Sequence, residues 1–188
     1  VTGVQTCALP ISHVGPISSD QIDMGAGRDP FAMQHRHLGH RRRRDDFRIP
    51  SVTVRSHAKI NLGLQVLRKR ADGYHDIETV FHRIALADNV TLSKRERGIT
   101  CRCSDPRIPG DERNLCVRAA AALFEAAGYD GGVFIDLEKY IPSGAGLGGG
   151  SSNAAAVLLA LQQLLDMSLP ADDIFCIASR LGSDVPYF

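Results

Sequence analysis

The stretch PSGAGLGGGSSNAA, residues 142–155, holds five glycines followed by two serines, and an apolar segment comes after it. Glycines let backbone N–H groups come close to an anion, and the N-terminus of a helix favours negative charge. Serine hydroxyls at such a position can bond a phosphate oxygen or a metal ion. The stretch therefore predicts a phosphate-binding loop made of Pro142, Ser143, Gly144, Ala145, Gly146, Leu147, Gly148, Gly149, Gly150, Ser151 and Ser152.

Three familiar kinds of glycine loop differ from this one in their surroundings. Gly144, Gly146 and Gly149 match the dinucleotide fingerprint G-x-G-x-x-G, but that fingerprint needs a second strand with an acidic end after the helix, and a second helix is expected here. A P-loop needs a lysine before its serine or threonine, which this loop lacks. A protein-kinase loop joins two strands, whereas a helix follows here. The loop thus indicates a different class of phosphate site.

The segments around the loop alternate as strands do. Between positions 59 and 66, apolar residues at even positions alternate with Lys59, Asn61, Gly63 and Gln65. This alternation predicts a strand with one buried face, so that Lys59 and Asn61 point together away from the core. Further strands are expected over 75–86, over 89–103 as two short strands joined by a polar turn, and over 132–142 with Val133, Ile135 and Leu137 on one face.

Three segments have the pattern of helices. Residues 114–128 are expected to form one, with Asn114 as its N-cap and Gly128 as its stop. Residues 153–166 are apolar around most of the helix circumference and should be buried. Residues 168–182 form the third, and 183–188 are expected to be a loop. The order of elements predicts an α+β fold with helices on one face of a mixed sheet.

Bulk composition excludes several classes of protein. The 188 residues carry a net charge of +1, with 44% hydrophobic and 23% charged residues, so no overall field selects nucleic acid or a membrane as partner. No apolar run is long enough to span a bilayer, and no signal peptide is evident. The five cysteines are odd in number and irregularly spaced, which argues against a disulfide framework and favours a cytoplasmic location.

The chain divides at about residue 48. Residues 1–47 lack a sustained period and include the run HRHLGHRRRRDD, so we expect a disordered or non-native tail. Residues 48–188 form the expected domain. The chain starts with Val1 and stops at Phe188 within an expected loop, so we expect a fragment of a longer reading frame.

Three motifs in order resemble a known family. PSGAGLGGGSSNAA resembles the central motif of the GHMP kinases. HAKINLGLQVLRKRADGYHDIETVF (57–81) resembles the N-terminal signature of the 4-diphosphocytidyl-2-C-methyl-D-erythritol kinases, and LGSDVPYF (181–188) resembles a later segment of theirs. The resemblance covers residues 48–188. It implies a GHMP kinase N-terminal domain with a fold like domain 2 of ribosomal protein S5, and it implies that the C-terminal GHMP domain is missing from this chain.

The resemblance also implies an activity and roles for single residues. The family transfers the γ-phosphoryl group of ATP to the 2-hydroxyl of 4-diphosphocytidyl-2-C-methyl-D-erythritol, in non-mevalonate isoprenoid biosynthesis. The resemblance implies that the glycine loop binds ATP and that Mg²⁺ bridges phosphate oxygens. Either Ser151 or Ser152 could be a ligand of the Mg²⁺ ion. Lys59 and Asp184 match the catalytic lysine and base, and the substrate-binding residues are Asn61, Tyr74 and His75.

Two alternatives remain at this point. One is another small-molecule GHMP kinase, such as a mevalonate or homoserine kinase, against which the D-G-Y-H element at 72–75 argues. The other is a non-catalytic, S5-like nucleic-acid-binding module, against which the net charge of +1 and the glycine loop argue. The expected partner is therefore a small-molecule substrate, with neither nucleic acid nor a membrane.

Overall fold

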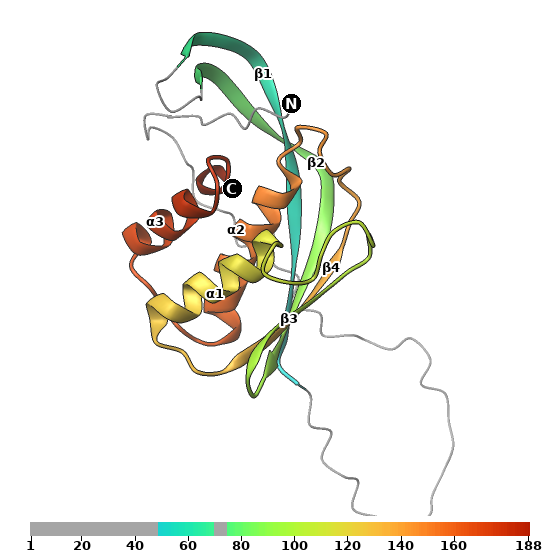
Figure 1. The fold of residues 1–188 in the computed structure, drawn as a ribbon, viewed down its shortest axis with the longest axis vertical. Coiled ribbons are helices and arrows are strands. Elements are labelled where there is room, and N and C mark those ends of the chain that lie inside the picture. The colour runs from blue at the N-terminus through green and yellow to red at the C-terminus, as the bar shows by residue number, and fades with distance from the viewer. Residues whose placement is uncertain (1–48, 70–74) are drawn as a thin grey trace, which may run out of the picture.

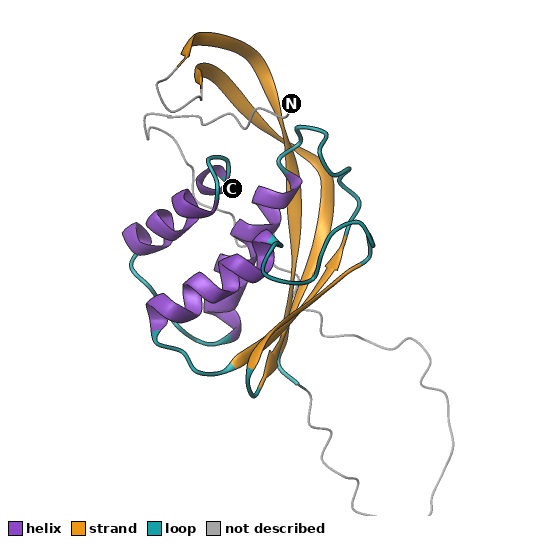
Figure 2. Ribbon diagram, in the orientation of Figure 1, coloured by secondary structure: helices purple, strands orange, loops and turns teal. Residues whose placement is uncertain are grey.

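The computed structural model describes residues 49–69 and 75–188, which form a helical layer packed on one sheet. The sheet order is β1-β2-β4-β3, with β3 parallel to β4 and the other pairs antiparallel. All helices of the described residues lie on the same face of this sheet (Figure 1), and Figure 2 shows the two layers side by side. The expected α+β fold is confirmed. The elements are β1 (Ser51–Lys69), β2 (His75–Arg95), β3 (Gly98–Cys103), α1 (Leu115–Ala127), β4 (Gly132–Glu138), α2 (Gly149–Leu164), α3 (Ala171–Leu181) and the 3₁₀ turn η2 (Val185–Tyr187).

The ends of the helices follow local sequence. The Asn114 side chain accepts a hydrogen bond from the backbone N–H of Cys116 at 2.9 Å and caps α1. Gly128 ends α1 in the left-handed conformation, with φ 61°, which costs glycine little because it has no Cβ. Pro170 precedes α3 and Gly182 follows it. The Asn114 cap and the Gly128 stop are as predicted.

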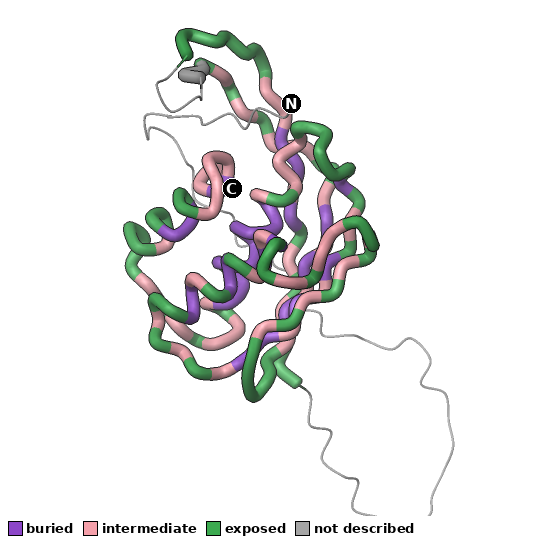
Figure 3. The backbone as a smooth tube through the Cα atoms, in the orientation of Figure 1, coloured by how far each residue is buried: buried purple, intermediate pink, exposed green. Residues whose placement is uncertain are grey.

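The core lies between the helices and the half of the sheet that they cover. Val133, Ile135 and Leu137 point inward from β4 and are buried, as predicted, and α2 has nine buried residues. Figure 3 shows buried positions gathered where the helices meet the strands. Each fully buried Leu, Ile or Val side chain contributes about 1.5–3 kcal/mol to the free energy of unfolding. The packing of the helices on the sheet is therefore the main source of stability.

The prediction of a buried apolar face on β1 is wrong for its second half. Leu62 and Leu64 are each 50% exposed and Val66 is 53% exposed, whereas Lys59 is only 6% exposed. The alternation breaks at Lys59 because the pairing of β1 with β2 shifts between His57 and Lys59, and the pairing shifts again around Gly63. Beyond these shifts the β1–β2 ribbon rises past the helices (Figure 1), and no described helix covers it.

Several element boundaries also differ from prediction, and among them β4 ends at Glu138 rather than at residue 142 and α3 begins at Ala171 rather than at residue 168. The strand over 75–86 and the first strand of 89–103 are one continuous strand, β2, because both halves pair with β1. Helix α2 begins at Gly149 rather than Asn153, so its first two residues are glycines of the loop. The expected loop over 183–188 contains the turn η2, with Pro186 near its start. A proline is tolerated there because the N–H groups at the start of a helical turn have no hydrogen-bond partner within the turn.

Candidate active site

The glycine loop turns sharply into the N-terminus of α2. Gly144, Gly146 and Gly148 have φ values of 76°, 75° and 68°, a region that other residues enter at a cost. Gly148 is the N-cap of α2 and offers no side chain to cap it. The first N–H groups of a helix have no partner within the helix, and here the helix dipole adds partial positive charge. The loop therefore has the backbone geometry and the partial positive charge that suit an anion.

The loop forms one wall of a cavity of about 510 Å³. Its other lining residues come from the start of α1, the end of β4 and the segment before α1. Leu115, Leu137 and Ile108 make part of this wall apolar, while Lys139 and the loop make part of it polar. An apolar wall beside a polar loop suits a ligand with a flat organic ring at one end and phosphates at the other. Cys116 also lines the cavity, and burial raises the pKa of its thiol, so it is no nucleophile at neutral pH.

Backbone contact joins the loop to β1 next to Lys59. The N–H of Lys59 donates to the carbonyl oxygen of Leu147 at 2.9 Å. The Cβ that Gly148 lacks would lie 3.0 Å from Cγ of Lys59 and 3.0 Å from the Phe188 ring. The absence of a side chain at Gly148 thus lets the loop pack directly against the lysine.

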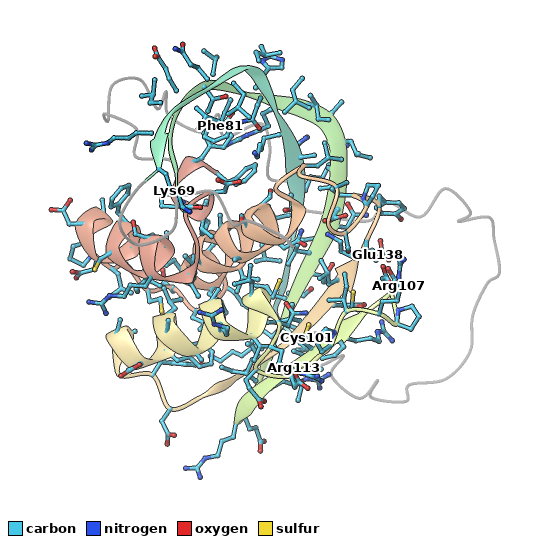
Figure 4. The ribbon with its side chains drawn as sticks, turned by 45° about the horizontal axis from the view of Figure 1, so that its top comes forward. Lys69, Phe81, Cys101, Arg107, Arg113 and Glu138 are labelled. Carbon is cyan, nitrogen blue, oxygen red and sulfur yellow. The ribbon has the colours of Figure 1, made fainter. Side chains whose placement is uncertain are left out.

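Lys59 is held between an amide and a carboxylate. Its Nζ donates to Oδ1 of Asn61 at 2.8 Å and lies 3.4 Å from Oδ2 of Asp184. It also lies 4.6 Å from the centre of the Phe81 ring, a cation–π distance. Figure 4 shows Phe81 in the upper ribbon, well away from Cys101 and Arg113 beside α1. The structure therefore brings Lys59, Asn61 and Asp184 together. The sequence predicts that Lys59 points away from the core, but the structure buries it against the loop and Asp184.

An aromatic cluster closes one side of this group. The rings of Phe81 and Tyr187 have centroids 4.8 Å apart, and those of Tyr187 and Phe188 are 5.1 Å apart. Burial raises the pKa of the Tyr187 hydroxyl, so this ring stays neutral. The aromatic rings restrict water around the lysine, which strengthens its attraction to Asp184.

A second polar network beneath the loop was not predicted. Asp88 is fully buried and accepts hydrogen bonds from the N–H groups of Tyr140 and Ile141, at 2.7 and 2.8 Å. It also accepts from Nζ of Lys139 and from Nδ2 of Asn153, the latter at 2.9 Å. These bonds tie β2 to the entrance of the glycine loop and to the first turn of α2. One feature of the sequence indicated a buried Asp88: residues 88, 90 and 92 share a strand face, and the other two, Val90 and Leu92, are apolar.

The two serines of the loop have different environments. Ser152 is 3% exposed, and its hydroxyl accepts a hydrogen bond from that of Ser56 at 2.7 Å. The same Ser56 oxygen accepts from Nδ2 of Asn153 at 2.9 Å, which extends the network beneath the loop. Ser151, by contrast, lines the cavity. Of the two serines, Ser151 is therefore the one placed to reach a ligand there.

Part of the predicted substrate site lies outside the described residues. Tyr74 is not described, and of His75 only the backbone is described, as the first residue of β2. Among the described residues no group of three His, Cys, Asp or Glu side chains is arranged to hold a metal ion. No helix in the described part of the chain is long and apolar enough to cross a membrane.

Comparison with known proteins gives consistent matches. Residues 114–188 match the family described as the GHMP kinases N terminal domain. A 4-diphosphocytidyl-2-C-methyl-D-erythritol kinase of Chlorobium phaeobacteroides (strain BS1) is 51% identical over 137 residues, covering 73% of this chain and 48% of the relative. The chain thus spans about half the length of the curated relatives it matches.

Solved structures agree with this result. A crystal structure of 4-(cytidine 5'-diphospho)-2C-methyl-D-erythritol kinase is 46% identical, has a TM-score of 0.63, and is matched over 73% of this chain and 48% of that one. A homoserine kinase from Cytophaga hutchinsonii is 23% identical with a TM-score of 0.54, over 77% of this chain and 43% of that one. The second likeness concerns the fold alone.

Proposed function

Because this chain belongs to the GHMP kinase family, we propose that the whole protein is an ATP-dependent kinase acting on the 2-hydroxyl of 4-diphosphocytidyl-2-C-methyl-D-erythritol. The observation that carries the proposal is the position of the Lys59–Asp184 pair, 3.4 Å apart, directly against the glycine loop. A kinase of this type would supply a phosphorylated intermediate for isoprenoid synthesis in the cytoplasm.

Asp184 is the base in this proposal. Its carboxylate accepts the proton of the acceptor hydroxyl, the oxygen forms a bond to the γ-phosphorus of ATP, and the bond to the β–γ bridging oxygen breaks to release ADP. Lys59 has two effects at once. Its positive charge attracts the Asp184 carboxylate 3.4 Å away, and it stabilises negative charge that develops on the attacking oxygen. Its burial strengthens both effects, since little water screens the charge.

In this proposal ATP binds in the cavity beside the glycine loop. The N-terminus of α2 and the backbone of Pro142 to Ser152 favour the phosphates, and the apolar wall near Leu115 suits the adenine ring. Mg²⁺, when bound, neutralises charge on the phosphates. Mg²⁺ needs few protein ligands, because it keeps several of its waters. The Ser151 hydroxyl suits the role of ligand better than the Ser152 hydroxyl, because Ser151 lines the cavity and Ser152 is bonded to Ser56.

The acceptor would bind on the ribbon side of the site. Asn61 lies beside Lys59, where its amide can contact the sugar alcohol. Tyr74 and His75 belong to the D-G-Y-H element of the sequence, and we assign them to the cytidine, for stacking and for hydrogen bonds to the base edge. This assignment rests on the D-G-Y-H motif.

The test is a substrate panel with the purified whole protein. Phosphate transfer from ATP is measured with the cytidylyl sugar alcohol, with mevalonate and with homoserine as acceptors. We expect turnover only with the first, and equal or better turnover of either other acceptor would overturn the substrate assignment. In Asp184→Asn, kcat should fall by about 10²-fold or more, since general-base catalysis contributes about 10²–10⁴-fold. Activity within threefold of the parent would remove Asp184 from the mechanism.

A further inference from the structure

A chain of hydrogen bonds runs from the ribbon to Lys59. The hydroxyl of Thr79 on β2 donates to the carbonyl oxygen of Gly63 at 2.7 Å. Nδ2 of Asn61 donates to the same Thr79 oxygen at 3.0 Å, and Oδ1 of Asn61 accepts from Nζ of Lys59 at 2.8 Å. The chain therefore has four members in sequence, Gly63, Thr79, Asn61 and Lys59, and its last member faces Asp184 at 3.4 Å.

The direction of each bond in this chain is fixed by chemistry. A carbonyl oxygen carries no proton, so Thr79 must donate its only proton to Gly63. Thr79 can then only accept from Asn61, which places the NH₂ group of that amide toward the threonine. The amide oxygen must point the other way, toward Lys59, whose ammonium group can only donate. The two ends of the chain thus demand the same orientation of the Asn61 amide.

The carbonyl oxygen of Gly63, which accepts the hydrogen bond from Thr79, is available because of an irregularity in β1. Gly63 has a φ of 74°, and the strand register skips it, so that Leu62 pairs with Val80 and Leu64 with Thr79. An unpaired residue in a bulged strand leaves a backbone group for another partner, and here the hydroxyl of Thr79 takes it. The bulge and the threonine therefore act as one unit.

We propose that Thr79 is a positioning residue, which fixes the amide of Asn61 and through it the direction of the Lys59 ammonium group toward Asp184. Among the described residues, the hydrogen bonds of Thr79 go to Gly63 and Asn61, so Thr79 acts on Lys59 through Asn61. This inference rests on the proposed kinase function for its kinetic consequence, but the amide orientation itself can be measured without catalysis.

The experiment compares Thr79→Val, which keeps the branched shape and removes the hydroxyl, with Thr79→Ser, which keeps the hydroxyl. In the whole protein, kcat should fall by about tenfold in Thr79→Val, which corresponds to about 1.4 kcal/mol in the barrier. The KM for ATP should stay within about twofold, because the cavity is built from other elements. Thr79→Ser should restore most of kcat.

A matched control comes from the same two strands. The hydroxyls of Thr53 on β1 and Thr91 on β2 lie 2.9 Å apart, away from Lys59, so Thr53→Val removes a similar hydroxyl without touching the chain. If Thr79→Val and Thr53→Val have the same kcat, the proposal is overturned. A rise in the KM for ATP with unchanged kcat would overturn it as well.

Nuclear magnetic resonance of the Asn61 side-chain amide separates this proposal from the proposed function. Its N–H protons should exchange faster with water in Thr79→Val than in the parent, and should not change in Thr53→Val. If the whole protein phosphorylates none of the acceptors, the proposed function fails, but the exchange measurement still shows whether Thr79 fixes the Asn61 amide. Unchanged Asn61 exchange in Thr79→Val would overturn the positioning role.

Discussion

Replacement of Gly148 by alanine tests whether the glycine loop sets the position of the lysine. The added Cβ would lie 3.0 Å from Cγ and 3.2 Å from Cε of Lys59, and 3.0 Å from the Phe188 ring. Contacts this short require the neighbours to move by a few tenths of an ångström. Gly148 also has a φ of 68°, where alanine is strained by about 1–2 kcal/mol.

The two effects can be separated by a second glycine. Gly98 has a φ of 78°, and nothing lies within 4 Å of the Cβ it would gain, so Gly98→Ala brings the backbone strain without the contact. Both variants should lose about 1–2 kcal/mol of unfolding free energy from the strain. Gly148→Ala should in addition shift Lys59. Since a misplacement of about 1 Å costs about 10²-fold in rate, a shift of a few tenths should lower kcat by about fivefold to tenfold.

The assay is steady-state turnover of the whole protein, with urea unfolding of the same samples. We expect similar losses of stability in Gly148→Ala and Gly98→Ala, and reduced kcat only in the former. If both variants keep the kcat of the parent, the loop does not position Lys59, and the packing seen at Gly148 has only a structural consequence. If both lose kcat equally, the loss comes from backbone strain.

Three further predictions concern the network beneath the loop, the two serines and the thiols. Asp88→Asn should lower the unfolding free energy, measured in urea, by about 3–5 kcal/mol, because it leaves a buried ammonium group without its counter-charge; a loss below about 1 kcal/mol would contradict this reading of the network. Ser151→Ala should raise the Mg²⁺ concentration needed for half-maximal activity by several-fold, whereas Ser152→Ala should mainly lower stability; the opposite pattern would exchange their roles. Burial raises the pKa of the Cys101 thiol to about 11, so at pH 8 iodoacetamide should label it at least tenfold more slowly than the exposed Cys176, as followed by peptide mass spectrometry, and equal rates would disprove the protonated state of Cys101.

The sequence could predict those features that depend on neighbouring residues. The Asn114 cap and the Gly128 stop follow from contacts within a single helical turn. The glycine loop could be identified because the left-handed backbone at Gly148 and the open end of α2 depend on residue types in one short segment. Motif resemblance then pointed to Lys59 and Asp184, whose proximity no local pattern contains.

The tertiary structure alone decided which groups meet. Asn61 and Thr79 are 18 positions apart, and Asp88 and Asn153 are 65 apart, so their contacts depend on strand register and on how α2 packs on the sheet. The register shift between His57 and Lys59 buried Lys59 against the simple alternation of the sequence, whereas Leu62 and Leu64 are exposed because no described helix covers that part of the ribbon (Figure 1). A period of two fixes a face only while pairing is regular, and one skipped residue transfers every later side chain to the opposite face.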